Sequence, residues 1–191
     1  MRLRRVCVFC GSSHGSRLTF AQAADGLGRL LASEGIELVY GGGDVGLMGV
    51  IADAVMDAGG EVVGVIPESL VRAEVAHRGL TRLEVVPDMH VRKARMAELS
   101  DGFIALPGGL GTFEELFEQL TWRQLGLHNK ATVALDIDGY FEPLFAMMRA
   151  TVDEGFAKQV TLDLLRRATS PLQALEMLRE QGPEIPPKWL R

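Results

Sequence analysis

Cysteine and histidine are scarce in this sequence, which limits the chemistry that it can support. The 191 residues include two cysteines, Cys7 and Cys10, in an apolar run that is predicted to be extended. Because side chains alternate along an extended chain, residues three apart face opposite sides, and we expect buried or site-lining thiols rather than a redox or metal pair. The four histidines are scattered without the spacing of metal ligands. We therefore predict no metal site and no cofactor.

The sequence also lacks an excess of positive charge and any long hydrophobic run. Its net charge is −5, which argues against nucleic-acid binding through a basic face. No apolar stretch approaches the ~20 residues of a membrane-spanning helix, and the apolar residues before Gly11 are too few for a signal peptide. We expect a cytoplasmic protein that binds neither nucleic acid nor a membrane.

What the chain does contain is a regular alternation of short apolar runs and amphipathic segments. Hydrophobic residues make up 47% and charged residues 24%, an ordinary globular balance, and no repeat or internal linker interrupts the pattern. Alternating strands and helices are typical of an α/β fold. We predict a single domain over residues 1–191, a Rossmann-like, doubly wound parallel sheet with helices on both faces, in which 183–191 form an extended C-terminal tail.

The boundaries of the segments follow from apolar periodicity and from the residues that begin and end helices. Gly35 is placed to close the first helix, and Ser170 with Pro171 to begin the last one. The polar stretch 67–82 is predicted to be a loop, long enough to serve as a lid or binding segment. Strands are predicted at 5–10, 36–40, 61–66, 83–86, 102–106, 132–137 and 164–168, and helices at 18–34, up to 58, 89–99, from 112, 141–154 and from 171.

The segment around which the rest is organised runs from Leu106 to Glu115, LPGGLGTFEE. Pro107 ends a buried strand, and three glycines then allow a tight turn and a close approach to a ligand. We predict that Thr112 opens the following helix. The first backbone N–H groups of a helix are unpaired, and together with the helix dipole they form an anion site, most often for phosphate.

Glu115 in this segment has two interpretations. It lies one turn inside the predicted helix, which would put a carboxylate beside the phosphate. Thr112 to Glu115 also fits the T-x-x-E capping box, in which Glu115 only bonds back to the amide that begins the helix. These residues alone leave both interpretations open, whereas Glu114 and Glu118 are expected to be solvated helix surface.

Two further glycine-rich loops follow predicted strands. The loop at 11–16 suits the close approach of a ligand, and equally an ordinary turn with helix-capping serines. In the loop at 41–49, three glycines match G-x-G-x-x-G, but a dinucleotide site needs an acidic residue at the end of the next strand, and Glu68 lies beyond that end. We predict a second glycine-rich wall for a smaller ligand.

A cluster of basic residues lies on the helix that Asp88 is predicted to cap. Arg92, Lys93 and Arg95 belong to it, and such residues often pair with acids on a helix surface, as Arg95 could with Glu98. The helix begins just after a strand end, however, and in a parallel sheet these ends share the edge where ligands bind. We therefore expect the cluster to lie near the ligand.

These segments together resemble one known family. Residues 107–115 match the P-G-G-x-G-T-x-x-E signature of the LONELY GUY family of cytokinin riboside 5′-monophosphate phosphoribohydrolases, whose members are often mislabelled as lysine decarboxylases. The resemblance spans residues 6–180, with small departures at Phe20 and Ala131, where tyrosine and proline are common. It also includes the segments 10–13, 40–49, 89–94, 126–130 and 138–140.

The resemblance implies an enzyme that hydrolyses the N-glycosidic bond of a nucleoside 5′-monophosphate, often one with an N6-prenylated adenine, into the free base and ribose 5-phosphate. It implies that Glu115 and Arg92 are catalytic, that no cofactor takes part and that the protein is a homodimer. Met48 by itself would be expected to pack in the core. The positions that match the family's substrate-binding residues or glycine loops are Gly11, Ser12, Gly42, Gly43, Met48, Glu74, Lys93, Gly108, Gly109, Leu110, Gly111, Thr112 and Thr121.

The chemistry of the residues agrees with that reaction. Breaking a C1′–N9 bond builds positive charge on the sugar, much as in glycoside hydrolysis. An ionised Glu115 could stabilise that charge or deprotonate water, and a helix N-terminus is expected to favour its ionised form. Arg92 could hold the phosphate, orient Glu115 or favour charge on the departing base, and the sequence leaves these roles open.

Three other functions compete with this one. A general AMP nucleosidase without a hormone role would have the same residues. A non-catalytic nucleotide-sensing module would share the fold, but it has no need of intact Arg92 and Glu115. Lysine decarboxylation is disfavoured, because pyridoxal chemistry needs a Schiff-base lysine and none of the four lysines lies in a recognisable cofactor setting.

Overall fold

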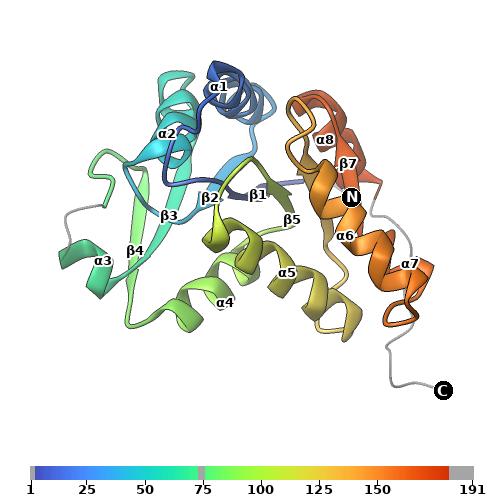
Figure 1. Cartoon of the computed structure of the whole chain (residues 1–191). Coiled ribbons are helices and arrows are strands. Elements are labelled where there is room, and N and C mark those ends of the chain that lie inside the picture. The colour runs from blue at the N-terminus through green and yellow to red at the C-terminus, as the bar shows by residue number, and fades with distance from the viewer. Residues whose placement is uncertain (1–2, 73–75, 181–191) are drawn as a thin grey trace.

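The computed structural model describes residues 3–72 and 76–180 of the chain. Within these residues the strands form one seven-stranded sheet in the order β4-β3-β2-β1-β5-β6-β7 (Figure 1). Each strand runs parallel to its neighbours, which confirms the predicted fold class. The strands are β1 (Arg5–Phe9), β2 (Glu37–Tyr40), β3 (Val62–Pro67), β4 (Arg82–Val86), β5 (Gly102–Ala105), β6 (Ala131–Leu135) and β7 (Leu165–Ala168).

The sheet is wound in two directions from β1. The chain first adds β2, β3 and β4 on one side, and then crosses over to place β5 against the other side of β1, followed by β6 and β7. Cys7 on β1 is therefore paired with Val39 on β2 and with Phe103 on β5. The strand order reverses between β1 and β5, and sheets of this kind bind ligands at such a point, beyond the carboxyl ends of the strands.

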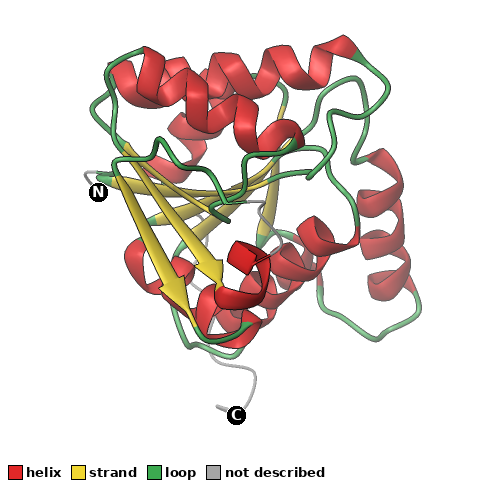
Figure 2. Cartoon of the chain, turned by 90° about the vertical axis from the view of Figure 1, so that its left-hand side faces the viewer, coloured by secondary structure: helices red, strands yellow, loops and turns green. Residues whose placement is uncertain are grey.

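Helices cover both faces of the sheet, as Figure 2 shows. On one face, α1, α2 and α8 pack against Val6 and Val8 of β1. On the other face, α4 packs against Cys7, and α5 and α6 continue this layer over β5 and β6. The helices are α1 (Leu18–Ser33), α2 (Gly46–Asp57), α3 (Glu68–Arg72), α4 (Met89–Leu99), α5 (Leu110–Gln124), α6 (Glu142–Asp153), α7 (Gln159–Leu162) and α8 (Pro171–Arg179).

The two cysteines lie on opposite faces of the sheet. Cys7 packs with the residues under α4, and Cys10 packs with those under α1 and α2. Both are buried free thiols, and burial raises the pKa of each above its ordinary value. The prediction of two separate buried thiols is confirmed.

Two predicted segments differ from the structure, and one short helix was not predicted. The stretch 67–82 is not a continuous loop, because α3 occupies its first residues. Helix α5 begins at Leu110 rather than at Thr112, since the glycine turn itself starts the helix. The short helix α7 was not predicted, because four residues are too few to show a helical period. The predicted tail at 183–191 lies outside the described residues.

The described residues contain neither a membrane-spanning helix nor a cluster of metal-ligating side chains. No helix in the described part of the chain is long and apolar enough to cross a membrane. Within 3–72 and 76–180, no group of three or more His, Cys, Asp or Glu side chains comes together as metal ligands would.

Candidate active site

The turn after β5 presents unpaired amides, as its glycines predicted. Gly109 is the N-cap of α5 and provides no side chain to cap it. The first backbone bond of the helix runs from the amide of Phe113 to the carbonyl of Gly109, at 3.1 Å. Within the described residues, none of the amides from Gly109 to Thr112 donates a hydrogen bond. Free N–H groups at the positive end of a helix dipole attract an anion such as phosphate.

The glycines of this turn fall into two kinds. A Cβ on Gly108 would lie 2.1 Å from the hydroxyl oxygen of Thr112 and 2.8 Å from the amide nitrogen of Gly11, so the packing of the protein requires glycine there. A Cβ on Gly109 or Gly111 would meet nothing within 4 Å, and neither has a positive φ. The space beside these two glycines is therefore open to a ligand that approaches the backbone closely.

The glycine loops after β1 and β2 pack against this turn. The amide of Gly11 donates to the carbonyl of Pro107 at 3.0 Å, and the amide of Leu47 donates to the carbonyl of Gly11 at 3.0 Å. A Cβ on Gly46 would lie 2.3 Å from the backbone of Ser12. A cavity of about 300 Å³ lies between the loops, lined by residues 11–15, Pro107, Gly108, Gly109, Phe20, Leu47 and Tyr140. The three glycine loops thus lie together at the carboxyl edge of the sheet, as predicted.

Arg92 on α4 and Glu115 on α5 form a buried ion pair. The guanidinium Nη1 lies 2.7 Å from the carboxylate Oε1, and the side chains are 8% and 11% exposed. The Nε of Arg92 also donates to the carbonyl of Val65 on β3, at 3.0 Å. The capping-box interpretation is wrong, because the helix begins two residues before Thr112 and the carboxylate bonds to Arg92.

Gly41 makes room for this arginine, a role that sequence analysis missed. A Cβ on Gly41 would lie 2.0 Å from Nη2 of Arg92. The absence of a side chain just after β2 therefore leaves the space that the guanidinium occupies. The sequence shows a glycine at this position, but it cannot show that Arg92, which lies on α4, packs against it.

Burial raises the pKa of the Glu115 carboxyl above its ordinary value, and the charge of Arg92 and its hydrogen bond oppose that shift. We expected the helix N-terminus to favour the ionised form. Glu115 lies in the second turn of α5, however, and the dipole effect is limited to the first turn. The prevailing effect is desolvation, which makes the carboxylate a stronger base than an exposed one.

Lys93 forms a second buried cluster beside this pair. Its Nζ lies 2.5 Å from Glu114 and 3.0 Å from Glu118. Burial alone would lower the pKa of Lys93, but hydrogen bonds to the two carboxylates raise it above its ordinary value. Glu118 is only 19% exposed, so its prediction as solvated surface was wrong, whereas Glu114 is half exposed. Arg95 pairs with Glu98 at 2.8 Å, as one interpretation predicted.

The structure places two further predicted residues, Thr121 and Met48, and a third lies outside its described range. Glu74 lies outside the described residues. Thr121 is exposed and donates to the carbonyl of Phe117 at 2.7 Å. Six residues beyond Glu115, it lies about 240° further around the helix and faces another direction. Met48 is half-buried and packs against the core, as its type predicted. Its sulfur also lies near Arg92, because a Cβ on Gly41 would lie 3.4 Å from Sδ of Met48 and 2.0 Å from Nη2 of the arginine.

The second glycine loop is held from the side of β3 and β4. Gly42 has a φ of 75°, and its carbonyl accepts the amide of His77 at 2.9 Å. Gly43 forms an isolated antiparallel bridge with Ala76. Ala76 and His77 therefore lie beside the second glycine loop, within the stretch 67–82 that was expected to serve as a binding segment.

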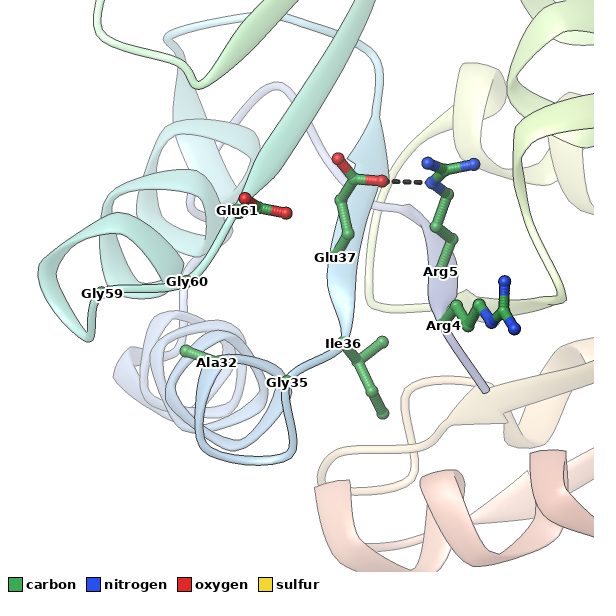
Figure 3. A pocket seen from close by; sticks show the side chains of 9 residues that line it. All are labelled: Arg4, Arg5, Ala32, Gly35, Ile36, Glu37, Gly59, Gly60 and Glu61. Carbon is green, nitrogen blue, oxygen red and sulfur yellow. Dashed lines mark hydrogen bonds and ion pairs between the residues drawn. The ribbon is translucent and has the colours of Figure 1, made fainter. Parts of the chain in front are cut away.

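Another cavity lies elsewhere in the described residues. It has a volume of about 480 Å³ and lies at the amino ends of β1 and β2, opposite the glycine turns. Figure 3 shows Arg5 paired with Glu37 among its lining residues, which also include Arg4 and Glu61. None of the predicted site residues lines it, so the candidate site is at the other edge of the sheet.

Comparisons with known proteins agree with this geometry. A family model described as "Possible lysine decarboxylase" matches residues 48–178. The chain is 54% identical over 159 residues to a cytokinin riboside 5′-monophosphate phosphoribohydrolase of Rhodococcoides fascians, covering 83% of this chain and 80% of that protein. It is 44% identical over 182 residues to the enzyme LOG3 of Arabidopsis thaliana, covering 95% and 85%.

Solved structures also resemble this fold. A molybdenum cofactor binding protein from Rippkaea orientalis aligns with a TM-score of 0.72 at 24% identity, covering 94% of this chain and 98% of that chain. An identity this low supports the shared fold alone.

Proposed function

The chain belongs to the family of cytokinin riboside 5′-monophosphate phosphoribohydrolases, and from this premise we propose that it hydrolyses the N-glycosidic bond of an N6-modified adenosine 5′-monophosphate. The products are the free cytokinin base and ribose 5-phosphate. The observation that carries the proposal is the buried Arg92–Glu115 pair, which lies one helical turn behind a row of unpaired amides. A phosphate site one helical turn from a basic carboxylate is arranged to bind a sugar phosphate, with the phosphate at the amides and the sugar at the carboxylate.

In this proposal the phosphate binds at the amides from Gly109 to Thr112. Their N–H groups have no acceptor within the described part of the chain, and the open space beside Gly109 and Gly111 admits the oxygens of the phosphate. Glu115 lies three residues further along α5, a rise of about 4.5 Å. A sugar attached to the bound phosphate therefore reaches the carboxylate.

Glu115 acts as the general base. A water molecule attacks C1′ of the ribose, its proton passes to the carboxylate, and the electron pair of the C1′–N9 bond leaves with the base. The departing base takes up a proton from solvent, and the carboxylate releases its own proton to solvent. The raised pKa of Glu115 increases its affinity for that proton, and its negative charge also stabilises the positive sugar in the transition state.

Arg92 orients Glu115. Of the three roles that the sequence left open, the 2.7 Å bond to the carboxylate supports this one. The second bond, from Nε to the carbonyl of Val65, fixes the guanidinium plane, so the carboxylate is held by a donor that cannot swing away.

Lysine decarboxylation is not proposed. A Schiff base forms from a neutral amine, and Lys93, the lysine nearest the candidate site in the described residues, is held as a cation between two carboxylates. A module that only senses nucleotides is also disfavoured, because burying the Arg92–Glu115 pair carries a desolvation penalty that anion binding alone does not require.

The protein acts in this proposal as a cytoplasmic homodimer. Large apolar side chains are exposed on α4 and just after α5, with Met89 41%, Val91 41% and Leu127 68% exposed, and such a surface suits a second copy of the chain. Two buried free thiols are consistent with a reducing compartment. Analytical ultracentrifugation tests the dimer, and a monomer at micromolar concentration would contradict it.

A substrate panel tests the activity. AMP, isopentenyl-AMP, GMP and CMP are each incubated with the protein beside their unphosphorylated nucleosides, and the free base is measured by chromatography. We expect the adenosine monophosphates to be cleaved and the nucleosides to react far more slowly. Preference for isopentenyl-AMP over AMP separates a hormone-activating enzyme from a general AMP nucleosidase. Equal rates on nucleosides and monophosphates would contradict phosphate anchoring.

Two variants test the site residues. Glu115→Gln should lower the release of base by about 10²- to 10⁴-fold, the usual contribution of a general acid or base, and Arg92→Ala should have a similar effect because it leaves that base without its orienting partner. Glu98→Gln serves as a control, because it neutralises an exposed carboxylate that is paired on the surface with Arg95. Near-wild-type turnover in either site variant would contradict the assignment.

A further inference from the structure

One segment that the proposed chemistry does not use is the loop after β6, residues 136–141, here called the β6 loop. It carries the only tyrosine that reaches the phosphate turn in the described chain. The hydroxyl of Tyr140 donates a hydrogen bond to the carbonyl oxygen of Gly108. Tyr140 also lines the cavity of about 300 Å³ between the phosphate turn and the loop after β1.

The carbonyl of Gly108 and the amide of Gly109 belong to one peptide unit and point in opposite directions. A carbonyl anchored by Tyr140 therefore aims the N–H of Gly109 away from Tyr140, among the amides that are unpaired at the start of α5. Glycine on both sides makes this peptide unit free to rotate. If it did, a carbonyl oxygen would replace an N–H at the anion site and repel the phosphate.

The β6 loop is built to hold the tyrosine in place. The fully buried Asp136 accepts the amide of Phe141 at 2.8 Å and forms an ion pair with Arg167. Asp138 has a φ of 53°, which is unusual for a residue other than glycine, and its carboxylate accepts the hydroxyl of Thr19 on α1 at 2.6 Å. Strained backbone of this kind persists where the surroundings enforce it, often at functional sites.

The ring of Tyr140 is held on three sides by aromatic neighbours. Its centroid lies 5.1 Å from that of Phe141 and 5.6 Å from that of Phe20, both edge to face, and 6.5 Å from that of Phe113 in a stacked arrangement. The ring is thus fixed by packing alone, and the hydroxyl is free to serve the hydrogen bond to Gly108. Removing only the oxygen should leave the ring where it is.

We infer that Tyr140 is a positioning residue for phosphate recognition, which acts through the Gly108–Gly109 peptide unit. The inference rests on the proposed function, because it concerns the same phosphate site. It assigns a role to the Asp138-Gly139-Tyr140 segment, which the chemistry proposed for Glu115 and Arg92 does not use.

Tyr140→Phe tests the inference in the whole 191-residue chain, with ribose 5-phosphate binding measured by calorimetry. We expect the Kd to rise about 2- to 12-fold, the factor that corresponds to the ~0.5–1.5 kcal/mol net contribution of one hydrogen bond. The KM for AMP should rise by a similar factor while kcat changes little, because the carboxylate and its arginine are untouched.

The control is Thr151→Val, which removes another hydroxyl that donates to a backbone carbonyl, that of Met148 on α6, away from the site. Both variants should lower the melting temperature slightly, and only Tyr140→Phe should weaken the binding of ribose 5-phosphate. An unchanged Kd and KM in Tyr140→Phe would overturn the inference, as would an equal loss in the control.

The outcome is separable from that of the proposed function. A wild-type protein that binds ribose 5-phosphate but releases no base would refute the enzyme activity, and the binding comparison would still decide the role of Tyr140. A wild-type protein that releases base, with a tyrosine variant of unchanged affinity, would refute the role of Tyr140 alone.

Discussion

Replacing Gly111 with alanine should make the protein more stable and less active, two effects of opposite sign from one methyl group. Gly111 is the second residue of α5, its φ is not positive, and a Cβ there would meet nothing within 4 Å. Nothing in the fold opposes the added atom. The open space beside it is where we place the phosphate.

The gain in stability follows from helix propensity. Alanine is favoured over glycine by about 0.8–1 kcal/mol in a helix interior, and by less in the first turn. For a domain of this size, 1 kcal/mol corresponds to about 2–4 °C in melting temperature, so we expect a rise of roughly 1–4 °C. Differential scanning calorimetry without ligand measures it.

The loss of activity follows from the position of the methyl group at the anion site. A hydrogen bond to a charged group contributes about 1.5–3 kcal/mol, so losing even one amide contact to the phosphate should lower kcat/KM for AMP about 10- to 150-fold. Steady-state release of adenine measures this ratio, and ribose 5-phosphate should bind correspondingly more weakly.

Gly26→Ala is the matched control. Gly26 lies inside α1, and a Cβ there would also meet nothing within 4 Å, but the position is remote from the phosphate turn. It should raise the melting temperature and leave activity unchanged. Full activity in Gly111→Ala, with the expected gain in stability, would refute the placement of the phosphate.

Three further predictions concern the pair and the core. Arg92→Lys should lower turnover about 10²-fold, because an ammonium cannot hold Val65 and Glu115 together in one plane, and retained turnover would refute the orienting role. Burial raises the pKa of Glu115, so kcat should fall as pH decreases through a value above the ordinary 4.5, since protonation removes the base; a flat profile down to pH 4.5 would contradict this. Gly28→Ala should lower stability by about 1–3 kcal/mol, because its Cβ would lie 2.8 Å from the carbonyl oxygen of Ile51; an unchanged melting temperature would show that α1 and α2 can separate freely.

Local chemistry in the sequence was enough to predict much of the fold. Asp88 was expected to begin α4, and its carboxylate accepts the amides of His90 and Val91 at 2.8 and 2.9 Å. Ser170 likewise begins α8 by accepting the amide of Gln173. Signals of this kind are contained in three or four neighbouring residues, so they can be recognised without knowledge of the tertiary structure.

The candidate site could be predicted only in its parts. Glu115 had a local partner available in the capping box, and nothing in its own segment indicated that Arg92, 23 residues earlier, would take it instead. The burial of Glu118 could not be predicted either, because its partner Lys93 lies on another helix. The two side chains meet only once α4 and α5 lie side by side on the sheet. The space that Gly41 leaves for Arg92 likewise depends on packing between elements.

The crossover from β4 to β5 means that the Arg92–Glu115 pair can form only after β5 has docked against β1. Arg92 belongs to the half of the chain that builds β1 to β4, and Glu115 follows the strand that must insert against β1 afterwards. Until β5 docks there, the acid and its cation reside in separate substructures. During refolding, recovery of turnover should consequently lag behind the appearance of helical signal and coincide with the docking of β5 against β1.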